Sequence, residues 1–178
     1  MFWREVQLRI GTTLSELRRL HTTMRIEIAK RADGSGVLRC TRHDGTIAWQ
    51  KQPKHGAHFA LHDLTHFAVE TSLGYSRGFF GLIASGWEFA DIGGKGPRGP
   101  LPPEALEVER LVGIFDSERA CNTLWTTEHF NAFSLRPLTH EEIAKVRAAR
   151  AKLFRKWLAV SLGGNLVLEY KPAPTPVK

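Results

Sequence analysis

The chain has 178 residues, which suits one domain that buries a core without disulfides or a structural metal. Its net charge is +7, and its longest apolar run, Phe79 to Ala84, is far too short to cross a bilayer, which argues against a membrane protein. Cys40 and Cys121 match no CxxC or secreted disulfide pattern, and charges interrupt the N-terminal residues where a signal peptide needs an apolar run. We therefore expect reduced thiols and a cytoplasmic location.

The charge is unevenly distributed along the sequence. Residues 57–144 carry 6 Lys/Arg and 12 Asp/Glu, whereas the two flanking parts together carry 19 and 6. Basic flanks are compatible with nucleic-acid binding through phosphate contacts, and the acidic middle is compatible with a cation site. Net charge alone says nothing about the fold, and solvated charged faces would explain the same numbers.

The first part of the chain predicts a short helix followed by an antiparallel sheet. The capping box Thr13-Leu-Ser-Glu16 begins a helix that runs to about Leu20. Apolar residues then recur at every second position, which predicts strands over 24–29, 37–42 and 46–51. Two Asp-Gly pairs between these strands are typical of tight turns. Such a sheet buries one face, so helices should cover it.

Three helices are expected in the middle of the chain. One covers about 60–73 and ends at Gly74. The next, over about 76–91, is apolar almost all round and contains three glycines, which indicates a buried helix in close contact with a neighbour. A Gly/Pro segment, 93–103, precedes a third helix that begins at its last two prolines.

The last part of the chain predicts one long helix and one strand. Residues 123–138 show no regular pattern, and Thr139-His-Glu-Glu142 is a second capping box that opens an amphipathic helix. Gly163 and Gly164 end it, and residues 166–170 follow as a strand that joins the sheet. The sequence therefore predicts one α+β domain over 1–171, with a three- to four-stranded antiparallel sheet packed against about four helices. Residues 172–178 are expected to form a flexible tail.

The most informative motif is a group of histidines. Four of the eight histidines fall within twelve residues, at positions 55, 58, 62 and 66. His62 and His66 are four apart in a predicted helix, so their side chains lie on one face about 6 Å apart along the axis. Two neutral imidazoles in this arrangement provide half the ligands of a tetrahedral metal ion, and zinc is the ion we expect first among divalent metals.

A third ligand must come from outside this pair. Glu70 lies about 12 Å along the helix from His62, too far to share the same ion. We expect Glu88 first and Glu109 second, because both sit on predicted buried helices, with His58 as a further candidate. Asp63 and Glu70 are then expected to orient the imidazoles or to act as the general base.

The histidine segment resembles known metal-binding families. His62-Asp63-Leu-Thr-His66 resembles the HExxH motif of zincin-type metalloproteases, with an aspartate where those enzymes have the glutamate general base. It also resembles the HDxxH motif of the coenzyme-Q biosynthesis accessory proteins, which carry a glutamate three turns later, where this chain has Gly78. The whole chain, above all HDLTHFAVE and the Gly/Phe-rich segment after it, is most similar to an uncharacterised family of small bacterial proteins, which implies no activity.

Three functional hypotheses follow. The first is a small soluble metal-binding protein, with a metal-dependent hydrolase of a small molecule or peptide as its enzymatic form. The second is a metal-free structural or regulatory protein whose histidines form hydrogen bonds in the core. The third, least favoured, is a nucleic-acid binder, since no nucleic-acid-binding motif is present. Its candidate contact residues are Arg147, Arg150, Lys152, Arg155 and Lys156.

Overall fold

The computed structural model describes residues 23–52 and 56–173. The capping box at Thr13 and the short helix predicted after it lie outside these residues, as do His55 and residues 174–178 of the predicted tail. Within the described residues, the chain forms an antiparallel sheet and a set of helices packed against it.

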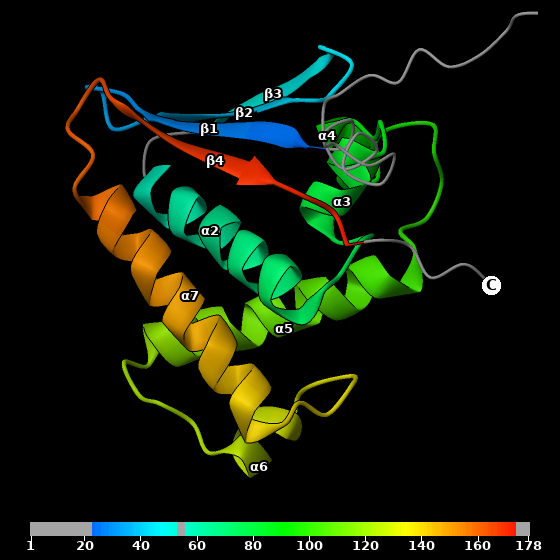
Figure 1. Ribbon diagram of the computed structural model, residues 1–178, viewed down its shortest axis with the longest axis vertical. Helices are drawn as coiled ribbons and strands as arrows, with labels where there is room; N and C mark the ends of the chain where they lie inside the picture. Colours follow the sequence, from blue (N-terminus) through cyan, green and yellow to red (C-terminus); the bar gives the residue numbers. More distant parts are fainter. Residues whose placement is uncertain (1–22, 53–55, 174–178) are drawn as a thin grey trace, which may run out of the picture.

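The four-stranded antiparallel sheet forms one layer of the molecule (Figure 1). The alternating apolar residues predicted strands, and the structure confirms them. Strand β1 pairs with β2 and β4, and the strand order is β3-β2-β1-β4. Every second side chain on β1 and β2 is buried, including Ile26, Ile28 and Leu38, because alternate residues of a strand face the same side of a sheet. The strands are β1 (Met24–Lys30), β2 (Gly36–Thr41), β3 (Ile47–Gln52) and β4 (Asn165–Tyr170).

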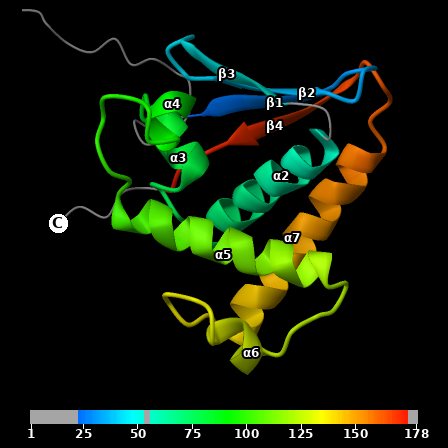
Figure 2. The ribbon, with the colours of Figure 1, turned by 180° about the vertical axis from the view of Figure 1, so that it is seen from behind.

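Helices cover one face of this sheet, which confirms the predicted α+β class. Helix α2 lies next to the sheet and contacts both α5 and α7, which cross below it (Figures 1 and 2). Among the helices of the described residues, none combines the length and apolar content that a membrane crossing requires. The helices are α2 (Gly56–Leu73), α3 (Phe79–Ala84), α4 (Phe89–Ile92), α5 (Pro103–Ala120), α6 (Thr127–Asn131) and α7 (His140–Leu158).

The structure differs from the sequence predictions in two helical segments. The helix expected over 76–91 is two short helices, because Gly86 adopts a positive φ of 93° and ends α3 before α4 begins. Positive φ is accessible to glycine at little cost and stops a right-handed helix. The segment 123–138 is not wholly irregular, since Thr126 caps the short helix α6 by accepting a hydrogen bond from the backbone of His129.

Candidate metal centre

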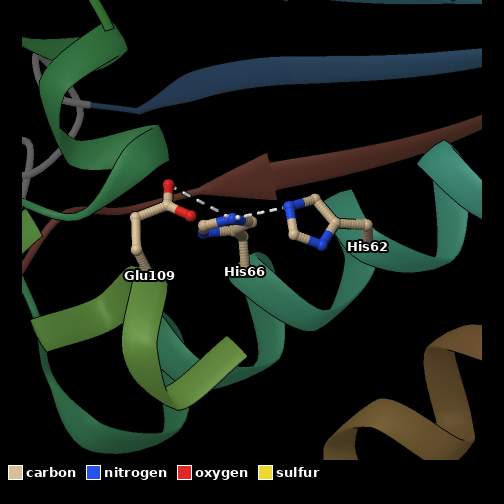
Figure 3. Close-up of side chains that lie close together, drawn as sticks. All are labelled: His62, His66 and Glu109. Atoms are coloured by element: carbon tan, nitrogen blue, oxygen red, sulfur yellow. Dashed lines mark hydrogen bonds and ion pairs between the residues drawn. The ribbon is translucent and has the colours of Figure 1, made fainter. Parts of the chain in front are cut away.

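Two histidines of α2 and one glutamate of α5 converge between these helices (Figure 3). The Nε2 atoms of His62 and His66 are 3.3 Å apart, and His66 Nε2 is 3.5 Å from Glu109 Oε1. All three ligand atoms lie within 4.8 Å of one another. The i, i+4 spacing places both imidazoles on the face of α2 that packs against α5, so the predicted juxtaposition of His62 and His66 is confirmed.

His62 is held by a second carboxylate of α5. Its Nδ1 lies 2.9 Å from Asp116 Oδ2, and this hydrogen bond raises the pKa of His62. Although burial alone would raise the pKa of Asp116, its hydrogen bond with His62 and the nearby Arg119 lower it. Because an ionised carboxylate only accepts hydrogen bonds, His62 Nδ1 carries a proton. In the neutral ring, Nε2 is then the atom with the free lone pair, and it points at His66.

His66 is enclosed by the core, and its side chain is 1% exposed. Burial lowers the pKa of His66 to about 3, which keeps the ring neutral at physiological pH. Its Nδ1 is one of two buried side-chain polar atoms in the described residues without a hydrogen-bond partner. The nearest carboxylate to that atom is Glu70, with Oε1 at 3.9 Å. A proton on Nδ1 would face this carboxylate and would leave Nε2 free to bind a metal.

The spacing of the two Nε2 atoms fits a single ion. Zinc–nitrogen bonds of about 2.0–2.1 Å at a tetrahedral angle place two nitrogens about 3.3 Å apart, and the observed separation is 3.3 Å. Glu109 reaches the pair from a side chain that is 40% exposed, and His62 is 37% exposed. The cluster is therefore open to solvent on the side of His62 and Glu109, while His66 closes the inner side.

Glu70 connects α2 with α3 and the sheet. Its carboxylate accepts hydrogen bonds from the backbone N–H groups of Phe80 and Gly81 at 3.1 and 3.0 Å and from the Tyr170 hydroxyl at 2.9 Å. Burial raises the pKa of Glu70 to about 7, against these three hydrogen bonds. A Cβ atom on Gly78 would lie 2.5 Å from Glu70 Cδ. A side chain at position 78 would therefore overlap the buried Glu70.

The structure brings Glu109, rather than Glu88, to the histidines. Glu88 lies between α3 and α4, where its half-exposed carboxylate pairs with Arg42 at 2.8 Å. The cause is the turn at Gly86, which redirects the chain before Glu88. His58 is exposed in the first turns of α2, and the cluster does not include it.

The two carboxylates expected to act as base or to orient the imidazoles have different surroundings. Glu70 faces the inner nitrogen of His66, in keeping with the orienting role. Asp63 is buried and accepts a hydrogen bond from Gln52 of β3, and within the described residues it forms no hydrogen bond or ion pair with either imidazole. Burial raises the pKa of Asp63 to about 7, against the effect of that hydrogen bond. Because both groups are enclosed, neither lies on the open side of the cluster, where a base would have to act.

Asp116 is the residue of this site that the sequence patterns did not single out. It follows Glu109 by seven residues, and residues two turns apart share a helix face. That spacing was available in the sequence. What the spacing could not supply was the knowledge that α5 packs against the histidine face of α2.

The predicted nucleic-acid surface on α7 is partly internal. Arg147 forms a hydrogen-bonded ion pair with the buried Glu118, and Arg150 donates to the backbone carbonyl of Phe115 and lies near the same carboxylate. These two cations therefore join α7 to α5 instead of facing solvent. Lys152, Arg155 and Lys156 are exposed.

Comparison of the chain with protein-family models, curated proteins and solved structures gave no match. The function of the site must therefore be argued from its own geometry.

Proposed function

We propose that the protein binds a divalent metal ion, zinc by preference, through His62, His66 and Glu109, and that it is a metal-dependent hydrolase. One observation carries the proposal. The Nε2 atoms of two histidines lie at the spacing of two zinc ligands, beside a carboxylate, while His62 Nδ1 is hydrogen-bonded to Asp116 and His66 Nδ1 lies 3.9 Å from Glu70. Imidazoles supported in this way are typical of metal sites.

The protonation of the rings separates this proposal from its main alternative. His62 Nδ1–H is required by Asp116, so His62 Nε2 offers a lone pair. If His66 carries its proton on Nδ1, toward Glu70, two lone pairs and a carboxylate lie within 4.8 Å of one another, and a cation between them would satisfy all three. If His66 carries it on Nε2, the ring donates to His62 without any metal. That second state is the metal-free alternative, and it leaves buried His66 Nδ1 without a donor among the described residues.

His62, His66 and Glu109 would supply three protein ligands, and the solvent-exposed side of the cluster would leave a fourth position for water. Structural zinc sites use four protein ligands, whereas catalytic sites keep one position for water. A metal held there would lower the pKa of that water toward 7. In hydrolysis, the water oxygen adds to a carbonyl carbon, the bond to the leaving nitrogen or oxygen breaks, and the water proton moves to the leaving group. Glu109, whose side chain is 40% exposed, is the carboxylate on the open side that would carry that proton.

Elemental analysis of the purified, untagged protein tests the proposal. We expect close to one zinc per chain, lost in His62→Ala and in His66→Ala and retained in His58→Ala, the matched control on the same helix. Far-ultraviolet circular dichroism checks that each variant is folded. Full metal content in both histidine variants, or none in the wild type after reconstitution with zinc, would overturn it. The metal-free alternative predicts that a chelator leaves the melting temperature unchanged.

A further inference from the structure

A largely apolar groove lies along α5 and borders the candidate metal centre at Glu109, with Arg110 and Ser117 as its other polar side chains. Its volume is about 670 Å³, and Glu109 of the metal cluster forms part of its lining. This volume falls within the range of small-molecule sites, roughly 300–1,000 Å³. The apolar side chains that line it are Leu106, Ile114, Trp125, Phe133 and Leu135.

The lining side chains leave much apolar surface exposed to water. Leu106 is 50% exposed, Phe133 is 47% exposed and Leu135 is 63% exposed. Gly113 contributes backbone to the floor of the groove, and a Cβ added there would meet no atom within 4 Å. Grouped exposed apolar residues around an open hollow are typical of a ligand-binding surface.

We propose that this groove, the α5 groove, binds the acyl chain of the substrate. The inference rests on the proposed function. Because Glu109 belongs to both the cluster and the groove, a substrate whose carbonyl group lay at the cluster would have the apolar lining beside it. The substrate class is therefore an amide or ester of an aliphatic acid. Hydrolysis releases that acid from the groove, and the amine or alcohol leaves toward solvent.

Alkyl hydroxamates of increasing chain length test the inference. Their head group chelates zinc and their tail occupies the groove. In titration calorimetry on the zinc-loaded protein, we expect Kd to fall about three- to fourfold for each added methylene from acetohydroxamate to octanohydroxamate, since each buried methylene adds a roughly constant transfer free energy.

Two groove variants and one control define the outcome. Gly113→Leu fills the groove and Leu135→Ser removes part of its wall, so both should flatten the chain-length dependence while leaving zinc content and the Kd of acetohydroxamate unchanged. Leu124→Ser, at an exposed leucine outside the groove, should keep the wild-type dependence.

The result separates failure of the groove from failure of the metal site. Zinc-loaded protein that binds acetohydroxamate and octanohydroxamate equally would overturn the groove assignment and leave the metal site intact. If the wild type is a dimer that Leu135→Ser dissociates, and Kd does not depend on chain length, the groove is instead the contact surface for a second copy of the chain. If no zinc binds, the proposed function fails. In that case, octanamide that binds the metal-free protein, but not the Gly113→Leu variant, would still support an aliphatic ligand in the groove. Octanamide that does not bind would overturn the groove assignment as well.

Discussion

The buried carboxyl of Asp63 predicts a folded state that becomes less stable as the pH rises. Burial raises the pKa of Asp63 from 3.8 to about 7, against the opposing hydrogen bond from Gln52. The unfolded chain therefore loses this proton at a lower pH than the folded protein. The stabilisation is complete below about pH 3.8 and is lost as the pH rises through about 7. At about 1.4 kcal/mol for each pKa unit, ionisation costs the folded state roughly 4 kcal/mol at pH 8.

The substitution Asp63→Asn should remove this dependence. Asparagine has nearly the same shape, its carbonyl oxygen can accept from Gln52 Nε2, and its amide can donate to Gln52 Oε1, a buried atom without a partner in the described residues. Urea denaturation of the metal-free protein at pH 5 and pH 8 measures the effect. The free energy of unfolding of the variant, relative to wild type, should rise by about 2–3 kcal/mol between these pH values.

A control variant and a comparison at the two pH values test whether burial raises the pKa of Asp63. Glu169→Gln changes an exposed carboxylate of β4 and should retain the wild-type pH dependence. Titrating groups on which the charge of Asp63 has no effect, such as His66 and Glu70, act equally in variant and wild type and cancel in the difference. A difference between Asp63→Asn and wild type that stays constant from pH 5 to pH 8 would show that burial does not hold the proton on Asp63.

Two further predictions concern the support of the histidines. Asp116→Asn should weaken zinc binding roughly 10–100-fold in a competition titration, because the aspartate fixes the proton on His62 Nδ1, whereas an unchanged affinity would remove Asp116 from the site. Gly78→Ala should destabilise the protein by about 1–3 kcal/mol, because the new methyl group would overlap the buried Glu70 side chain. Gly113→Ala, in an open position of α5, should stabilise it by about 0.5–1 kcal/mol, and equal effects of the two alanines in chemical denaturation would contradict the packing argument.

Local sequence patterns predicted the helices and strands well where a short motif determines the secondary structure. The alternation in β1 identified its buried side chains, and the capping box at Thr139 identified the start of α7 at His140, where the reciprocal hydrogen bonds with Glu142 are present. The break at Gly86 was missed because apolar residues continue on both sides of it. Its left-handed backbone depends on the packing of α3 and α4, which no periodicity reports.

The candidate site was predicted only in part for a related reason. The spacing of His62 and His66 fixes their common helix face, because both belong to one element. The choice between Glu88 and Glu109 depends on which helix packs against that face and at which position along α2. Both glutamates sit on predicted buried helices, so the sequence does not distinguish them. The packing of α5 against α2 and the ion pair of Glu88 with Arg42 distinguish them.

The division of the cluster between two helices has a mechanical consequence. His62 and His66 belong to α2, which lies against the sheet, whereas Glu109 and Asp116 belong to α5, on the outer layer of the molecule. An ion bound by residues of both helices would act as a cross-link between two segments distant in sequence. Separation of α5 from α2 would then require release of the ion, so amide hydrogens in both helices should exchange more slowly, and by the same factor, once the metal is bound.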